Sequence, residues 1–425
     1  MKRETFEIKN GIKLHFVKTE LFKTNLAAVM ITTPLSKENV TENALIPFVL
    51  KRGSKNFRTQ EEINSKLEEM YGTIYDCGID KNGDNQIMKF YLENVNDRFL
   101  DKGILKESLN LFFDIIFNPL FENNMFLPEY VAQEKENLRK VIDGKIDEKG
   151  SYAFNRCVEE MYKSEGYGIY KFGYTENLES ITAESISKRY IELINNSKID
   201  IFISGNLNKE EVIEDVITNE NIVKLQGRDG EYILNNESTE CKENVENPSE
   251  VIEKMDVNQG KLVIGLDLLS NMPDFRYVGI VYNAILGDGS NSMLFQNVRE
   301  KASLAYSARS NFIKQKKNIF IRCGIEIEVF EKALEIIKEQ LENIKNGNFT
   351  NQNLEDAKRY LESGIKIIEN EQDTELVYYF GQEISKTDVT PKEYIEKVRS
   401  VTKEQIIEFA KDIQVNTIYF LKNLD

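Results

Sequence analysis

Residues 286–307, LGDGSNSMLFQNVREKASLAYS, are the most distinctive stretch of this chain of 425 residues. Gly287 and Gly289 flank an aspartate and indicate a tight turn, because glycine adopts backbone conformations that other residues avoid. The turn lacks the Gly-Lys-Ser/Thr ending of a phosphate-binding loop. We therefore expect it to have a structural role and not to bind a nucleotide.

A repeat places this stretch in the second of two related segments. Residues 180–186 (SITAESI) recur near the C-terminus as residues 400–406 (SVTKEQI). Each copy is typical of a helix start, and a β-rich run follows each helix, at 199–204 and at 417–421. Repeats separated by such a length indicate a duplicated domain and not a short-period solenoid.

The local patterns predict strands and helices in both segments. Thr59 and Glu62 have the spacing of a capping box, which indicates a helix start. An Asn-Gly-Asp turn at 82–84 indicates a hairpin. We predict strands at 11–17, 26–33, 73–76, 86–94 and 261–268, and helices following Thr59 and over 105–116, 129–149, 277–286 and 334–344. Residues 235–250 are polar and acidic, as in a linker. The chain is thus predicted to be an α+β protein with halves at 1–234 and 254–425, joined by a linker at 235–253.

Composition excludes several classes of protein. The apolar content of 41% and the charged content of 30% are those of a globular protein. No apolar run is long enough to span a bilayer, and the N-terminus lacks the apolar core of a signal peptide, so we expect a cytoplasmic protein that does not bind membranes. A net charge of −16 without a basic cluster argues against binding to nucleic acid.

The counts of histidine and cysteine restrict the chemistry further. The chain has one histidine, His15, within an alternating pattern typical of a strand. Catalytic zinc usually takes two or three histidines, and a nucleophilic serine or cysteine needs one beside it. The four cysteines, Cys77, Cys157, Cys241 and Cys323, form no C-x-x-C pair. Most hydrolase mechanisms are therefore excluded, although catalysis by a pair of carboxylates stays open.

Three stretches together resemble the insulinase-type (pitrilysin-like, inverzincin) peptidase family, in its bacterial processing-peptidase branch. They are residues 173–182 (GYTENLESIT), 201–207 (IFISGNL) and 286–307. The resemblance extends over nearly the whole chain. It implies a metallopeptidase LuxS/MPP-like fold, in which each half has mixed or antiparallel sheets covered by helices. The chain is also similar to Gram-positive proteins associated with elongation factor P modification, a label that implies a pathway context but no reaction.

Active members of this family carry H-x-x-E-H on a helix, where two histidines bind zinc and the glutamate acts as general base. Counting back from the Gly-Ser turn at 53–54, these positions fall on residues 44–48, ALIPF. Ala44 and Phe48 replace the histidines, and Pro47 replaces the glutamate. Pro47 further suggests that the helix begins close by, because proline is tolerated mainly in a first turn.

The family's third zinc ligand is a glutamate on a later helix. Glu134 matches the glutamate that supports it, but the ligand position falls on Val141. We therefore expect the chain to bind no zinc and to have no metallopeptidase activity alone.

Arg299 and Tyr306 match a pair that the family retains in its second half. In active members this pair faces the zinc site, holds the substrate backbone and steadies the developing oxyanion, a role that suits a fixed cation and a neutral donor. The resemblance thus implies that Arg299 and Tyr306 bind substrate. The alternative is an arginine on a solvated helix end and a tyrosine that fills a core.

The resemblance suggests that two different subunits together form the active enzyme. In two-subunit enzymes of this branch, one chain carries zinc and the other carries the Arg/Tyr pair. The first hypothesis is therefore a non-catalytic, peptide-binding subunit that supplies Arg299 and Tyr306 to a homologous partner with H-x-x-E-H and zinc. The second is a zinc-free scaffold or peptide-binding pseudoenzyme, with homodimers possible. An active enzyme with relocated chemistry is a third.

Overall fold

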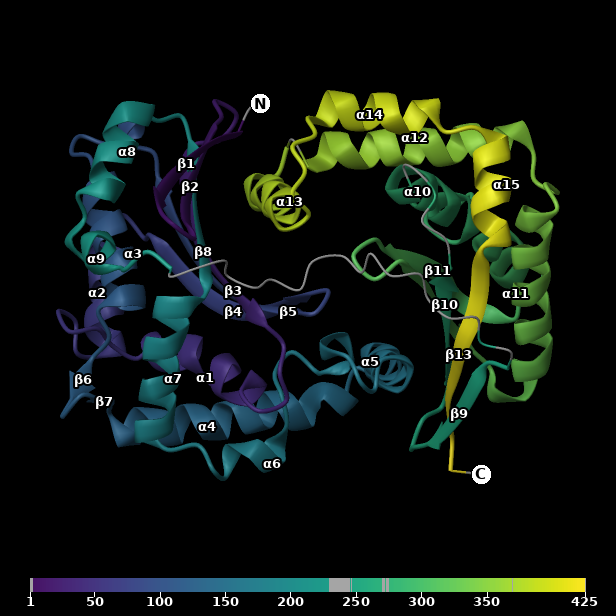
Figure 1. The fold of residues 1–425 in the computed structure, drawn as a ribbon, viewed down its shortest axis with the longest axis horizontal. Helices are drawn as coiled ribbons and strands as arrows, with labels where there is room; N and C mark the ends of the chain where they lie inside the picture. Colours follow the sequence, from purple (N-terminus) through teal and green to yellow (C-terminus); the bar gives the residue numbers. More distant parts are fainter. Residues whose placement is uncertain are drawn as a thin grey trace. The chain divides into compact units, whose positions relative to one another are not determined.

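The computed structural model describes residues 3–228, 245, 247–269, 272, 275–368 and 370–424. These residues form two compact units, each with its own sheet and core (Figure 1). The first unit consists of Met1–Asp143, Ile169–Asn235 and Ile368–Lys386, and the second of Gly144–Gly168, Asn236–Ile367 and Thr387–Asp425. In the described part of the chain, no helix has both the length and the apolar character needed to cross a bilayer.

The first unit contains a mixed six-stranded sheet in the order β1-β2-β8-β3-β5-β4. Its strands are β1 (Arg3–Lys9), β2 (Ile12–Lys18), β3 (Thr24–Pro34), β4 (Ile74–Asn82), β5 (Asn85–Val95) and β8 (Lys198–Gly205). Strands β2 and β8 are parallel, and the other neighbours are antiparallel. The predicted hairpin is β4–β5, and Gly83 in its turn has a positive φ of 55°, which glycine adopts without strain.

Helices cover the first sheet on both faces. The first unit contains α1 (Val40–Leu50), α2 (Gln60–Glu69), α3 (Leu105–Phe117), α4 (Pro128–Asp143), α6 (Thr175–Leu178), α7 (Ala183–Asn196), α8 (Lys209–Ile217), α9 (Glu220–Lys224) and α13 (Gln372–Ile384), with a short 3₁₀ turn at Asp97–Phe99 and a small hairpin of β6 (Phe121–Glu122) and β7 (Met125–Phe126). The predicted start of α2 is confirmed, since the Thr59 side chain accepts a hydrogen bond from the Glu62 amide.

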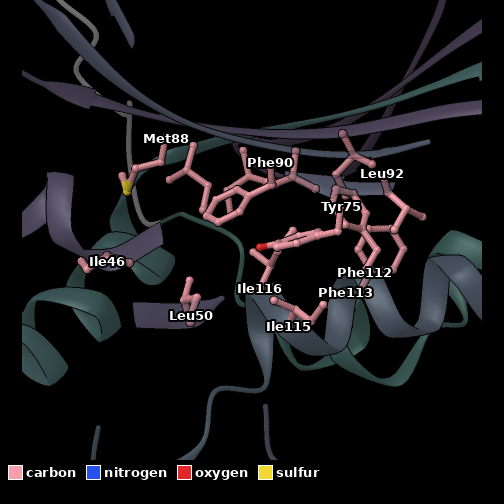
Figure 2. Packing of buried hydrophobic residues seen from close by; sticks show 14 of the residues in the cluster. Ile46, Leu50, Tyr75, Met88, Phe90, Leu92, Phe112, Phe113, Ile115 and Ile116 are labelled. Atoms are coloured by element: carbon pink, nitrogen blue, oxygen red, sulfur yellow. The ribbon is translucent and has the colours of Figure 1, made fainter. Parts of the chain in front are cut away.

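The alternation of side chains along β3 explains why both faces need cover. Ala27, Val29 and Ile31 join the main core. Figure 2 shows this core, in which Tyr75 of the sheet lies against Phe112 of α3 and Phe90 lies in the same apolar layer. The residues between them on β3 (Leu26, Ala28 and Met30) point to the other face, where they pack with Leu376, Tyr379, Phe380 and Ile384 of α13. Successive strand residues face opposite ways, so this strand is apolar at every position from Leu26 to Ile31.

The second unit is built on a five-stranded sheet in the order β11-β12-β10-β13-β9. Its strands are β9 (Ser249–Lys254), β10 (Gly260–Leu268), β11 (Ala305–Ile313), β12 (Asn318–Ile325) and β13 (Ile413–Lys422). Strand β9 is parallel to β13, and the other neighbours are antiparallel. The mixed sheets and the covering helices confirm the predicted α+β class.

The second sheet is also covered on both faces. The unit contains α5 (Lys149–Met161), α10 (Phe275–Leu286), α11 (Phe330–Lys345), α12 (Asn351–Ile368), α14 (Pro391–Ser400) and α15 (Lys403–Lys411), a π-helix at Phe295–Lys301 (η4) and 3₁₀ turns at Gly144–Ile146, Gly166–Gly168 and Ile327–Val329. Helices α10, α11 and α15 contribute to one core. On the opposite face, Tyr152, Cys157 and Val158 of α5 pack with Val263, Phe320, Tyr419 and Leu421 of the sheet.

The repeat noted in the sequence corresponds to two equivalent helix starts. Thr182 caps α7 and Thr402 caps α15, each in a capping box with the residue three positions later. Strand β8 follows α7 and strand β13 follows α15, as predicted.

The compact units differ from the segments 1–234 and 254–425 in two helices. Helix α5 precedes the linker but belongs to the second unit, and α13 follows it but belongs to the first. Each supplies an apolar face to an otherwise uncovered side of a sheet. Of the linker predicted at 235–253, residues 235–244 and 246 lie outside the described residues, as does Cys241. The last residues of the predicted linker, from Ser249 on, belong to β9. This segment has too few apolar residues to show a strand pattern, although it pairs with β13.

Replacing Phe112 with alanine tests the packing of the first core. Phe112 is fully buried against Tyr75 and Phe113. We expect Phe112→Ala to lower the free energy of unfolding of the first unit by about 3–5 kcal/mol, through lost burial and a residual cavity. Urea denaturation followed by circular dichroism measures this. Phe99→Ala is the matched control, because Phe99 is 50% exposed and its loss should cost less than about 0.5 kcal/mol. Equal effects of the two variants would contradict this account of the core.

Candidate functional site

The five positions of the degenerate motif lie on α1, within the core of the first unit. Ala44 and Pro47 are buried, and Phe48 is half-buried against the same core. Their side chains consist of hydrocarbon alone. Zinc needs nitrogen, sulfur or oxygen ligands, so the side chains at these positions do not fit a zinc ion.

Pro47 corrects one expectation from the sequence. We expected the helix to begin close to Pro47, but α1 begins at Val40 and Pro47 lies inside it. A proline there removes one backbone hydrogen bond of the helix. The helix is nevertheless held by contacts outside its own backbone. The side chain of Asn43 donates to Gln86 Oε1 at 2.9 Å and accepts from Arg189 Nε at 2.7 Å. Burial in the core thus outweighs the local preference of proline.

Glu134 and Val141 lie on α4, which packs against α1. Glu134 is buried and forms an ion pair with Arg52, and its two carboxylate oxygens each accept from Asn137 Nδ2 at 3.2 Å. Val141 is apolar and 43% exposed. The retained glutamate is therefore already neutralised by an arginine.

One other group of side chains in the described residues has the spacing of metal ligands. His15, Asp200 and Glu383 each offer an atom within 4.8 Å of the others. His15 lies on β2 as predicted for a strand, with Nε2 2.9 Å from Asp200 Oδ1 and Nδ1 3.0 Å from Thr5 Oγ1. Its ring stacks on Phe202 at 4.3 Å.

Lysines already neutralise this group. Lys198 Nζ lies 2.9 Å from Glu383 Oε1 and 3.1 Å from Asp200 Oδ2, the latter as an ion pair without hydrogen-bond geometry. Lys13 Nζ lies 2.7 Å from Glu383 Oε1. The Lys198 ammonium lies within 3.1 Å of both carboxylates that a metal ion would have to share. We interpret the group as a buried ion network that attaches α13 to β2 and β8.

Arg299 and Tyr306 are both exposed in the second unit. Arg299 lies on the π-helix η4, 42% exposed, with its guanidinium 4.5 Å from the centre of the Phe295 ring and Nε 3.6 Å from Glu300. Tyr306 lies on β11 and is 66% exposed. The structure thus excludes the alternative in which Tyr306 fills a core. Among the described residues, the two side chains form no hydrogen bond with each other. Whether they bind substrate stays a prediction.

The chain is similar to known proteins over its full length. The family model described as "Peptidase M16 inactive domain" matches residues 180–361. A Bacillus subtilis (strain 168) protein, "Probable inactive metalloprotease YmfF", is 33% identical over 418 residues, which are 98% of this chain and 96% of the relative. The chain belongs to the M16 peptidase family.

Solved structures have the same fold as this chain. A conserved protein from Enterococcus faecalis V583 superimposes with a TM-score of 0.89 at 25% identity, over 100% of this chain and 99% of that one. A peptidase M16 inactive domain from Pseudomonas fluorescens superimposes with a TM-score of 0.78 at 16% identity, over 100% of this chain and 99% of that one, which supports the fold alone. The chain is an inactive homologue of M16 metallopeptidases, as its lost ligands and its relatives indicate.

The backbone around the M16 Arg/Tyr pair is irregular at three points. Arg299 lies in a π-helix, Ser303 has a positive φ of 53°, and the register of β11 against β12 shifts between Ala305 and Ser307. Tyr306 is therefore the extra residue of a β-bulge. Such features cost free energy and recur at functional sites, where they redirect side chains. The pattern favours a role for these residues outside packing.

The cavities differ in what they offer chemically. A cavity of about 510 Å³ in the first unit lies beside α2, α3, α8 and α9. Its lysines are already paired, Lys66 with Glu107 at 2.5 Å and Lys106 with Asp215 at 2.6 Å. A smaller pocket in the second unit contains Arg309 and Arg322. Sequence reasoning missed this pair, because only the register of β11 and β12 brings the two residues together.

The ion network predicts how stability depends on pH. Burial alone would raise the pKa of Glu383, but Lys198 and Lys13 outweigh it and lower the pKa from 4.5 to about 2. A depressed carboxyl pKa contributes stability above the unfolded value, and that stability is lost as the pH falls. The docking of α13 should thus weaken between about pH 4.5 and about pH 2. Arg3, 3.6 Å from Glu383, and the His15 and Asp200 side chains also face this carboxylate.

Glu383→Gln should destabilise the first unit at pH 7 and flatten this acid dependence, because it removes at every pH the negative charge that Lys13 and Lys198 share. Urea midpoints measured across this pH range test both effects. Glu339→Gln is the control, since Glu339 is exposed on α11. A wild-type acid dependence that persists in Glu383→Gln would show that another group is responsible.

Proposed function

We propose that this chain is the non-catalytic, peptide-binding subunit of a heterodimeric zinc peptidase. Its partner would be a homologue that carries H-x-x-E-H and zinc. The observation that carries the proposal is the exposure of Arg299 and Tyr306 on irregular backbone. Exposed polar side chains neither fill a core nor connect elements, and an irregular backbone costs free energy. The combination is therefore hard to explain by stability.

The chemistry of the pair suits a peptide in an extended conformation. A guanidinium donates several hydrogen bonds in a fixed geometry, and a neutral phenol donates one. Both groups can therefore hold backbone carbonyls and stabilise negative charge that develops on one of them. The chain supplies no ligand for the metal, so in this proposal the partner alone provides the zinc and the general base.

The first unit has a strand edge of its own that suits a peptide in an extended conformation. Strand β4 is one of the two outer strands of the first sheet. Gly78 in its middle has open space where a side chain would lie, and Ile74 at its start is 61% exposed. Extended peptides bind to such edges by main-chain hydrogen bonds. This supports peptide binding without specifying a sequence.

The alternative is a zinc-free scaffold or peptide-binding pseudoenzyme with no role in proteolysis. The observation that favours it is the burial of Ala44 and Pro47. Positions that belong to the zinc motif in active members are here part of the hydrophobic core. This alternative needs no partner with zinc. It predicts that no homologue with H-x-x-E-H gains activity from this chain.

Reconstitution tests the proposal. The purified chain, the homologue with H-x-x-E-H from the same organism, and their mixture are assayed for zinc content and for cleavage of fluorogenic peptides. We expect the chain alone to hold no stoichiometric zinc and to cleave nothing, and we expect cleavage in the mixture. Arg299→Ala or Tyr306→Phe should lower kcat/KM of the mixture by about 100-fold or more, as for the loss of an oxyanion donor.

Matched variants separate loss of chemistry from loss of assembly. Arg359→Ala and Tyr71→Phe alter exposed residues on other elements and should leave cleavage unchanged. Size-exclusion chromatography checks that each variant still forms the complex. Zinc-dependent cleavage by the chain alone would refute the proposal. A mixture that never cleaves would support the scaffold alternative.

A further inference from the structure

A small pocket of about 160 Å³ lies in the second unit, beside the strand that carries Tyr306. The sheet contributes residues from β10, β11 and β12, and the start of α5 contributes the rest. The lining residues that matter here are Ser307, Arg309, Arg322, Lys261, Gly150 and Ser151. Three of these six residues are basic, in a chain whose net charge is −16.

The register of the sheet brings the two arginines together. Arg309 on β11 is directly opposite Arg322 on β12, and Arg322 is opposite Val263 on β10. Val263 packs with α5, and Ala308 packs into the core on the other face. The arginines therefore share the α5 face of the sheet. Like charges directly opposite each other destabilise a strand pair, so this arrangement has a cost that folding alone does not explain.

None of the three basic side chains is neutralised by a carboxylate in the described part of the chain. Arg309 is exposed and forms no ion pair. Arg322 donates from Nη2 to Asn311 Oδ1 at 2.6 Å and lies 4.7 Å from the centre of the Phe154 ring, but its buried Nε has no acceptor. Lys261 Nζ donates to the neutral side chain of Gln259. Burial and, to a smaller extent, the charge of Arg309 lower the pKa of Arg322 to about 10.

The polar surroundings also suit an anion. Gly150 and Ser151 lie in the first turn of α5, where backbone amides have no acceptor within the helix. Ser307 adds a hydroxyl donor. The one acidic lining residue, Glu148, is exposed, so water screens its charge. A metal cation would be repelled by this set of charges, whereas an anion would satisfy the free Nε and offset the repulsion between the arginines.

We propose that this pocket binds a carboxylate of the peptide that Tyr306 contacts. The proposal rests on the peptide-binding function above and adds a substrate class, peptides with an acidic side chain or a free C-terminus. The location supports a peptide as the source, because Ser307 of the pocket directly follows Tyr306 on the outer strand β11. Arginine pairs recognise carboxylates through charge-assisted hydrogen bonds, often two at once.

Fluorescence anisotropy with the full chain tests this assignment. Three labelled Ser/Thr/Val-based peptides of about ten residues, a length that suits strand-like binding, differ only in charge. One is amidated with an internal glutamate, one has a free C-terminal carboxylate with glutamine inside, and one is amidated with glutamine. We expect one of the carboxylate peptides to bind at least about tenfold more tightly than the neutral one, and which of them does so identifies the source.

Variants assign the preference to the pocket. Arg309→Gln should abolish the preference and leave the affinity for the neutral peptide unchanged, while Arg309→Lys should retain part of it. Arg359→Gln, an exposed arginine on α12, is the control and should change nothing. Tyr306→Phe should weaken all three peptides, which tests the peptide-binding function separately.

The remaining outcomes of these measurements each overturn the carboxylate assignment or both proposals. A preference that survives Arg309→Gln, or equal binding of all three peptides, overturns the carboxylate assignment and leaves peptide binding intact. If no peptide binds, both proposals fail. If inorganic phosphate displaces the acidic peptide at concentrations comparable with that of the peptide, the pocket is a simple phosphate site and the assignment to a peptide is overturned.

Discussion

A strand that is apolar on both faces must be covered on both faces, and this constraint determines the connectivity of the molecule. Strand β3 sends alternate residues into two separate cores, and β10 does the same in the second unit. The helices of the first unit that precede the linker pack on one face of the first sheet. Helix α13, which follows the linker, covers the other face. Helix α5 serves the second sheet in the same way. Each unit is completed by a helix from the other segment.

Buried charge then fixes where α13 docks. Its apolar residues attach it to the sheet, but apolar contact is tolerant of small shifts. Lys198 is almost fully buried and bridges Glu383 to Asp200, and Gln372 at the other end of the helix donates to the backbone and hydroxyl of Ser204 at 3.1 and 3.0 Å. Leaving any of these groups unpaired in the interior would be costly. The two ends of α13 are therefore each held in one position.

The sequence predicted features that depend on local pattern. The hairpin at Gly83, the cap at Thr59 and the paired helix starts at Thr182 and Thr402 all follow from short-range chemistry. The loss of zinc ligands followed from the resemblance to the family, which places Ala44, Pro47, Phe48 and Val141 at the motif positions, and from the single histidine. The helix around Pro47 was misjudged, because core packing overrode the local preference of proline.

Features that depend on long-range pairing were not predictable from the sequence. The exchange of α5 and α13 requires knowledge of which sheet face is left bare. The opposition of Arg309 and Arg322 requires the register of two strands. Strand β9 has only two apolar residues, Val251 and Ile252, and is defined by its pairing with β13.

The placement of α13 has a consequence for synthesis of the protein on the ribosome. The first sheet has all its strands once Gly205 has been made, yet the helix that covers its second face is among the last elements of the chain. Until then Leu26, Ala28 and Met30 have no partner from α13. From the completion of β8 until α13 has been made, the nascent first unit therefore lacks the cover of one apolar face of its sheet.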